Sequence, residues 1–181
     1  MKRDWSVAAL KAGLARATEV LEGMTGLTFQ ISGPVCRLME LETLPELASD
    51  SEAAMIAVYT RLLGDTPGHA VFLFTPAAAR SLADLMVGAG QPPTLRESAL
   101  SELCNVAGSA VLNVLADAGG MELVPSPPLV IEDMTGAVLQ SVAAGLATLS
   151  QVLVIEGVIS IGGESCSARL LMVPDDHVTV R

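Results

Sequence analysis

The sequence predicts an α+β domain that is built from two similar halves. In each half, a segment with helical periodicity precedes runs of alternating apolar residues and a hairpin signal. Shifting the sequence by 94 residues also superimposes turn residues of the halves: Gly26 on Gly120, Ser32 on Ser126, and Pro34 on Pro128. Such repetition indicates a duplicated unit. We therefore expect a single domain over 1–181, with half-repeats 1–93 and 94–181.

The first half begins with a segment of helical periodicity and continues with strand signals. The expected elements are a helix over 6–24, one or two strands over 27–42 broken at Gly33-Pro34, a strand over 53–63, a strand over 69–74 and a helix over 76–87. The turn residues at 64–68 join the two later strands into a hairpin, and Pro76 stands at a favoured first position of its helix.

The second half follows a boundary at 88–93 and repeats this order. We expect a long helix that starts at Thr94, with Glu97 completing a capping box, and ends at Gly119-Gly120. The elements after it are an extended turn over 126–128, a strand over 129–132, a helix over 135–149, a hairpin of 151–161 with 165–173 around Gly162-Gly163, and a loop with an edge strand over 174–181.

Composition and charge exclude several classes of protein. Apolar residues make up 51% of the chain and aromatic residues 3%, which predicts a folded core of Leu, Val, Ala and Met. The formal charge of −10 disfavours binding of nucleic acid or of free phosphorylated metabolites, and favours a positively charged or metal-loaded protein partner. The longest uncharged run, 135–155, contains polar residues and glycines and predicts no membrane insertion.

Cysteine and histidine usage points to a cytoplasmic protein without a metal site. The chain has an odd number of widely spaced cysteines, Cys36, Cys104 and Cys166, which we expect to be reduced and mostly buried. His69 and His177 are isolated and are expected to be structural or solvent-facing. Met1-Lys2-Arg3 is followed by an acidic residue and an amphipathic pattern, which does not predict a secretory signal.

A polar stripe on the long helix of the second half is the strongest functional signal. Ser98, Glu102 and Asn105 are four and three residues apart, so they share one helix face, and Ser109 and Asn113 extend it. The other side is apolar and is expected to face inward: Leu100, Leu103, Val106, Ala107, Ala110, Val111 and Val114. A carboxylate and a carboxamide are therefore expected to project outward from a rigid helix.

An ordinary solvated helix face is the simplest interpretation of this stripe, and two observations argue against it. Asn costs about 0.6 kcal/mol relative to Ala inside a helix, yet this helix contains it twice. The stripe also carries no Lys or Arg after Arg96, whereas solvated faces usually mix both signs of charge. In the first half the equivalents of Ser98, Glu102, Asn105 and Pro128 are Asp4, Ala8, Lys11 and Pro34. A site that needs Glu and Asn therefore occurs once per chain.

The stripe and the proline after it resemble the CheC/CheX/FliY family of bacterial chemotaxis phosphatases. That family's pattern is Asp or Ser, three residues, Glu, two residues, Asn, twenty-two residues, and Pro. This sequence satisfies all four positions with Ser98, Glu102, Asn105 and Pro128. The Gly64-Asp65 turn, the Phe74-Thr75-Pro76 step, the Ser126-Pro127-Pro128 turn and the duplicated layout are also similar. The resemblance implies a CheC-like pseudo-two-fold fold, with an antiparallel sheet flanked by two long helices and shorter ones.

The resemblance also implies an activity, which is hydrolysis of the aspartyl phosphate on a CheY-like response regulator. Asn105 would orient the attacking water and Glu102 would anchor a positive group of the partner, while Ser98 and Pro128 would support the helix and its turn. The regulator would supply its own Mg²⁺ and lysine, so no cofactor is expected on this chain. A single motif is closer to CheX, which works as a dimer, so both a monomer and a homodimer stay open.

Three other functions stay open at this point. The first is a non-catalytic binding module of the chemotaxis or flagellar switch apparatus, similar to FliM or to CheC-type proteins that bind the deamidase CheD; Lys11 in place of Asn is compatible with a changed partner. The second is action on a receiver domain outside chemotaxis. The third is a duplicated α+β domain whose stripe is merely solvated.

Overall fold

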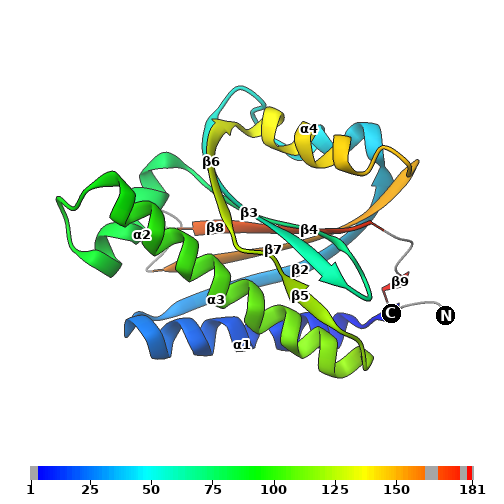
Figure 1. The fold of residues 1–181 in the computed structure, drawn as a ribbon, viewed down its shortest axis with the longest axis horizontal. Helices are drawn as coiled ribbons and strands as arrows, with labels where there is room; N and C mark the ends of the chain where they lie inside the picture. Colours follow the sequence, from blue (N-terminus) through cyan, green and yellow to red (C-terminus); the bar gives the residue numbers. More distant parts are fainter. Residues whose placement is uncertain (1–3, 162–166, 176–178, 181) are drawn as a thin grey trace.

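The computed structural model describes residues 4–161, 167–175 and 179–180. A central antiparallel sheet separates two groups of helices (Figure 1). The group on one face consists of α1 (Val7–Thr25), α2 (Pro76–Val87) and α3 (Pro93–Gly119). The short helix η1 (Leu41–Leu47) and α4 (Thr135–Gly145) lie across the other face of the sheet. The predicted α+β class, with two long helices beside an antiparallel sheet, is confirmed.

The main sheet has a symmetric strand order. Its order is β2-β7-β8-β4-β3-β5, with β6 also paired to β3. The strands are β2 (Phe29–Glu40), β3 (Ala54–Gly64), β4 (Gly68–Phe74), β5 (Leu123–Pro125), β6 (Leu129–Met134), β7 (Gln151–Ile161) and β8 (Ser167–Pro174). The hairpins β3–β4 and β7–β8 lie side by side through the β4–β8 pair. On the outer side, β2 pairs with β7 of one hairpin, and β5 and β6 pair with β3 of the other. This is the arrangement expected from a duplicated unit; the division into 1–93 and 94–181 stays a prediction.

Most predicted elements occur where the sequence places them. The helix over 76–87 and the strand over 151–161 have the predicted bounds. Within the 27–42 region one strand forms over Phe29–Glu40, and residues 41–42 already belong to η1. The register of this strand shifts between Ser32 and Val35, which accommodates Gly33-Pro34 within the pairing to β7. The helix predicted over 135–149 ends earlier, at Gly145, because glycine is a poor interior helix residue. The Gly162-Gly163 turn, Cys166 and His177 lie outside the described residues.

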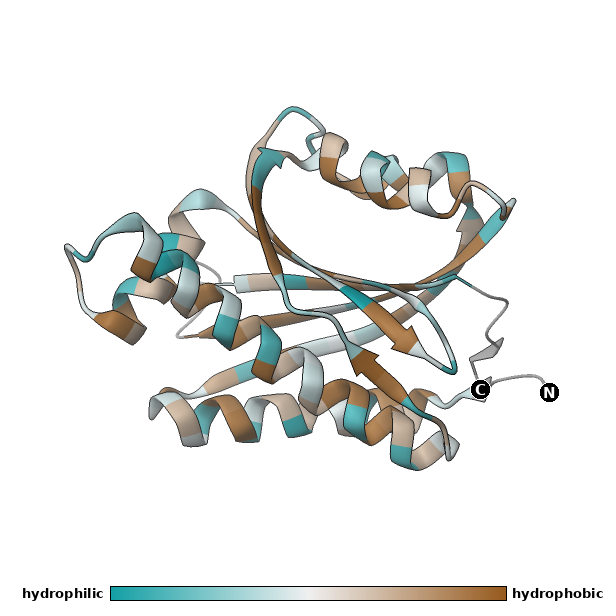
Figure 2. Cartoon of the chain, viewed as in Figure 1, coloured by the Kyte–Doolittle hydropathy of each residue, from teal (hydrophilic) through white to brown (hydrophobic). Residues whose placement is uncertain are grey.

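Alternation along the strands gives the sheet two separate hydrophobic faces. On β3, Val58 and Leu62 join the core beneath α1, α2 and α3, while Ala57 and Tyr59 belong to the core beneath α4 and η1. Apolar and polar bands alternate along α1 and α3, as expected of helices that cover one side of a sheet (Figure 2). The site on α3 and the surface under α4 are therefore on opposite faces.

Two short strands lie outside the main sheet. The strand β1 (Asp4–Trp5) pairs in parallel with β9 (Thr179–Val180), near the two chain ends in Figure 1. This pair puts Trp5 into the core under α3, where only 1% of its surface is exposed. The edge strand predicted within 174–181 therefore pairs with the chain start rather than with the main sheet.

One helix has the length and apolar composition of a membrane span. Within the described part of the chain this is α3, whose most apolar window has a mean hydropathy of 1.4. Half of that window is buried inside the protein, as in the core helix of a globular domain. A single helix of this kind is weak evidence for a membrane.

Candidate functional site on α3

The long helix α3 is built to hold its side chains in fixed positions. Its start differs from the prediction: the helix begins at Pro93 and no side chain caps it, so the capping box of Thr94 and Glu97 is wrong. Proline suits the first turn because the backbone N–H it lacks would have no partner there. At the other end, Gly120 adopts a left-handed conformation and its N–H donates to the Ala116 and Asp117 carbonyls, so the predicted glycine stop is confirmed.

Neighbouring helices fix α3 on both sides. Gly13 of α1 lies directly against Val111, where a Cβ on the glycine would come within 3.1 Å of the Val111 carbonyl oxygen. On the α2 side, Arg96 Nε donates to Asp84 Oδ1 at 2.8 Å. The inward face of α3 is buried at these residues: Ala99, Leu100, Leu103, Cys104, Ala107, Ala110, Val111, Leu112 and Leu115. The helix is therefore a rigid support for its outer face.

The polar stripe of α3 is graded from exposed to half-buried. Ser98 and Glu102 are exposed at the end near α2, whereas Asn105 and Ser109 are half-buried, and Asn113 is exposed again one turn further on. Neither the Glu102 carboxylate nor the Asn105 carboxamide makes a hydrogen bond or ion pair with another described residue. Both groups therefore keep their hydrogen-bonding capacity for a molecule that approaches the helix.

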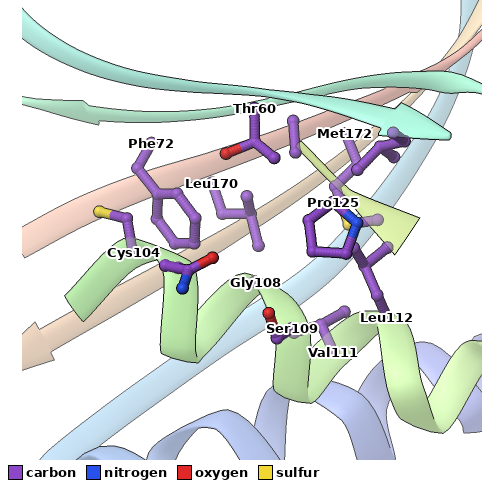
Figure 3. Close-up of a pocket in the computed structure, with 13 residues that line it drawn as sticks. Thr60, Phe72, Cys104, Gly108, Ser109, Val111, Leu112, Pro125, Leu170 and Met172 are labelled. Atoms are coloured by element: carbon purple, nitrogen blue, oxygen red, sulfur yellow. The ribbon is translucent and has the colours of Figure 1, made fainter. Parts of the chain in front are cut away.

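Asn105 lies where two hollows meet. Beneath it is a narrow, mostly apolar cavity between α3 and the sheet, lined on the helix by Cys104, Gly108, Ser109, Val111 and Leu112 and opposite by Thr60, Phe72, Pro125, Leu170 and Met172 (Figure 3). Beside it is an open groove of about 680 Å³ between α1 and α3. Asn105 is half-buried and lines both hollows.

The groove between α1 and α3 continues the polar stripe. Asn105, Ser109, Asn113 and Asp117 line it from α3, and Arg16 and Glu19 line it from α1. Arg16 Nη1 donates to Glu19 Oε2 at 2.9 Å on the exposed surface of α1. Ala8 and Lys11, which replace the motif residues on α1, are both exposed. The α1 side therefore offers no carboxylate–carboxamide pair of its own.

The turn that contains Pro128 is tied to the sheet beside this cavity. Pro125 lines the same cavity as Asn105, and the next residue, Ser126, is fixed to β3. Arg61 N–H donates to Ser126 Oγ at 3.0 Å, and Ser126 N–H donates to the Arg61 carbonyl at 2.8 Å. Pro128 is half-buried and leads into β6. The predicted extended turn is confirmed, and its place follows from these two hydrogen bonds.

The polar groups available at this site are the Glu102 carboxylate, the Asn105 carboxamide and the Ser109 hydroxyl. Cys104 is fully buried next to Asn105, and this burial raises the pKa of its thiol well above the ordinary value, so the thiol is protonated near neutral pH. Among the residues that the structure describes, no group of three His, Cys, Asp or Glu side chains is placed to hold a metal ion.

Sequence reasoning missed two parts of the site. The first is Pro125, which lines the cavity from β5; this strand is only three residues long, and its pairing to β3 has no local signature. The groove with α1 depends on which face of α1 meets α3; the small residue Gly13, flanked by helical periodicity, is the one local hint of such a close approach.

Comparison with known proteins identifies the class to which this fold belongs. No family model matches the sequence. The chain is 25% identical over 147 residues to the CheY-P phosphatase CheC of Bacillus subtilis (strain 168), covering 77% of this chain and 69% of that protein. The structure superposes on FliY of Thermotoga maritima with a TM-score of 0.72, at 18% identity over 92% of this chain and 86% of that chain.

A second structural neighbour was solved together with another protein. It is the CheX–CheY–BeF₃–Mg²⁺ complex from Borrelia burgdorferi, with a TM-score of 0.64 and 13% identity over 94% of this chain and 99% of that chain. The shared architecture defines a CheC-like fold. The chain is thus similar in sequence to CheC and in fold to FliY and CheX, the proteins of the family that the sequence motif resembles.

Proposed function

We propose that this protein is a cytoplasmic phosphatase that hydrolyses the aspartyl phosphate of a CheY-like receiver domain. The observation that carries the proposal is the pair Glu102 and Asn105: they lie one turn apart on the outer side of α3, and neither is bonded to another described residue. The relatives are consistent with such a partner, since one is called a CheY-P phosphatase and another was solved as a complex with CheY.

In this mechanism Asn105 places the attacking water. Its carboxamide oxygen accepts a hydrogen bond from the water, whose oxygen then attacks phosphorus in line with the leaving aspartate. A new P–O bond forms, the bond to the aspartyl carboxylate breaks with its electron pair, and the water protons pass to the product phosphate and solvent. Because an aspartate carboxylate is a good leaving group, positioning of the water supplies the main rate gain.

Glu102 aligns the two proteins rather than taking part in bond making. Its exposed carboxylate stands next to Asn105 on the helix and attracts a positive group of the receiver, which fixes the distance between Asn105 and the phosphoryl group. The receiver brings its own Mg²⁺, which neutralises charge on the phosphoryl oxygens. Ser98 and the turn at Pro128 support the two ends of this surface.

Phosphate release from a Mg²⁺-loaded, phosphorylated receiver tests the proposal. We expect the wild-type protein to accelerate phosphate release. In Asn105→Ala this acceleration should be about 100-fold smaller, or more, because loss of an orienting group can lower a rate by this factor. Asn113→Ala is the matched control, because it makes the same change two turns along the same helix at an exposed site. Equal losses in both variants, or no acceleration by the wild type, would refute the assignment of Asn105.

A non-catalytic binding module is the second candidate. The exposed Ala8 and Lys11 on α1 support it, because these residues stand where the sequence alignment of the two halves would place a second Glu and Asn. The groove between α1 and α3 would then be a contact surface for a component of the flagellar switch or for CheD. In the same assay a binding module would form a complex with the receiver without changing the rate of phosphate release.

A further inference from the structure

A separate cavity of about 200 Å³ lies on the opposite face of the sheet, under α4. It is lined by Leu129, Ile131 and Asp133 of β6, by Val138, Ser141 and Val142 of α4, and by Tyr59 and His69 of the β3–β4 hairpin. None of these residues belongs to the α3 site. Half of the lining residues are aliphatic, and the others bring polar groups, of which Asp133 and Ser141 are exposed. Apolar walls with a few polar groups are typical of sites for small molecules.

A hydrogen-bonded cluster supports the polar end of this cavity. Arg61 forms a two-pronged ion pair with Asp175, and its Nη1 also lies 2.9 Å from His69 Nε2 and 2.9 Å from the Gly68 carbonyl. His69 Nδ1 in turn lies 3.0 Å from the Tyr59 hydroxyl. His69 is only 6% exposed, so its ring is held in place by packing as well as by these contacts.

The donors in this cluster determine where the protons are. A guanidinium can only donate, so the 2.9 Å contact from Arg61 makes His69 Nε2 the acceptor; the Asp175 carboxylate is further away, at 3.3 Å. Burial and the charge of Arg61 lower the pKa of His69, against the opposing effect of Asp175, so the ring is neutral near pH 7. The single ring proton then resides on Nδ1 and is donated to the Tyr59 oxygen.

This tautomer leaves the Tyr59 hydroxyl with a proton to donate. Its oxygen already accepts from His69, and no other described group accepts a hydrogen bond from it. Tyr59 lines the cavity, so an acceptor inside the cavity would complete the chain Arg61–His69–Tyr59–ligand. The carboxylate of Asp133 at the rim, one oxygen of which accepts from the Met134 N–H, disfavours a negatively charged ligand.

We propose that this cavity is a binding site for a small, uncharged molecule with an apolar body and one hydrogen-bond acceptor, which receives the Tyr59 hydroxyl proton. The volume suits a body the size of a single aromatic ring. The chain connects this cavity to the turn beside α3, because Leu129 follows Pro128 directly and the backbone of Arg61 is hydrogen-bonded to Ser126.

Titration with three ring compounds, followed by amide chemical shifts, tests this site. Benzamide offers a neutral acceptor, toluene has no acceptor, and benzoate carries a negative charge. We expect benzamide to give saturable shifts at residues 129–133 and 138–142, with at least about tenfold weaker binding of toluene and benzoate, the factor that one hydrogen bond can supply. Equal binding of all three, no saturable shift, or shifts scattered over the surface would overturn the proposal.

Two conservative or exposed substitutions, with one control, test the site without requiring a large change in the stability of the protein. Tyr59→Phe removes the hydroxyl but keeps the ring, and is expected to weaken benzamide binding about tenfold. Ser141→Phe places a ring at the exposed rim and is expected to abolish binding, whereas Gln140→Phe, at the neighbouring exposed position outside the lining, is its matched control and should keep it. Unchanged binding in both Tyr59→Phe and Ser141→Phe would contradict the site, whatever the activity at α3.

Discussion

At the scale of single residues, the account depends on a division of labour between Asn105 and Glu102. Asn105 is half-buried above an apolar cavity, whereas Glu102 is exposed to solvent. A restricted group suits the orientation of water, and a mobile charged group suits attraction of a positive partner. The two residues should therefore affect different kinetic quantities.

Glu102→Gln tests the anchoring role. The change removes the charge but keeps the shape, so we expect the concentration of protein that gives half-maximal phosphate release to rise about tenfold while the maximal rate changes little. The dependence of binding on salt should also weaken, because a screened charge pair is lost. Loss of the maximal rate to the extent expected for Asn105→Ala would mean that Glu102 takes part in the chemical step.

At the scale of elements, α3 can orient Asn105 because α1 lies so close to it. A Cβ on Gly13 would lie 3.1 Å from the Val111 carbonyl oxygen, a tighter contact than is usual, so a larger side chain there pushes against the backbone of α3. The orientation of the polar stripe therefore depends on a helix whose own motif positions are occupied by Ala8 and Lys11. This gives the first half a structural role even without the polar pair.

Gly13→Leu is expected to destabilise the protein by at least about 2 kcal/mol, because the side chain must displace the backbone of α3. Urea denaturation measures the free energy of unfolding. The matched control is Gly23→Leu on the same helix, where a Cβ meets nothing within 4 Å; it should be neutral or stabilising, since Leu is the better helix former. A similar loss in both variants would show that the close contact does not hold α3.

The sequence predicts elements well where their signals are local. The helix that starts with Pro76 and stops at Gly88, and the strand of alternating residues at 151–161, have the predicted bounds. The short strand Leu123–Pro125 and the helix Leu41–Leu47 were not predicted, because tertiary contacts rather than local periodicity stabilise them. The capping box failed because Pro92-Pro93 starts the helix one residue before Thr94.

The same limit applies to the functional surfaces. The spacing of Glu102 and Asn105 on one helix is visible in the sequence, but the depth of Asn105 depends on Pro125, twenty residues away. His69 was predicted to be isolated, yet hairpin pairing puts it opposite Arg61, and Asp175 comes from beyond the second hairpin. The turn at 64–68 is predicted from the sequence, and it is sufficient to place Arg61 opposite His69. The ion pair with Asp175 has no local sequence signal, so it could not be predicted.

At the scale of the whole molecule, the sheet separates two polar sites of different character. The α3 side carries the exposed Glu102 and the half-buried Asn105, and the α4 side encloses a cluster around the buried His69. Burial and Arg61 lower the pKa of His69, while Asp175 opposes them. Folding is therefore coupled to the proton that this histidine binds.

The sign of that coupling gives a pH prediction. The pKa of His69 is lowered in the folded protein, so the unfolded chain binds a proton first as the pH falls through 6.5. The neutral His69 ring contributes its full stabilisation above pH 6.5. This contribution decreases as the pH falls from 6.5 to the lower pKa of His69 in the folded protein. We expect the free energy of unfolding to fall between pH 7.5 and 5.5, and His69→Asn to reduce this fall. An equal fall in the variant would contradict the coupling.

Single-turnover phosphate release, measured over a series of protein concentrations with one Mg²⁺-loaded phosphorylated receiver, is the most direct test of the central claim. It separates the maximal rate from the half-saturating concentration. For Asn105→Ala we expect a maximal rate that falls to the receiver's own rate of decay, with a half-saturating concentration within about twofold of the wild type. A retained maximal rate with weakened saturation would contradict it, because Asn105 would then bind the partner rather than orient the water.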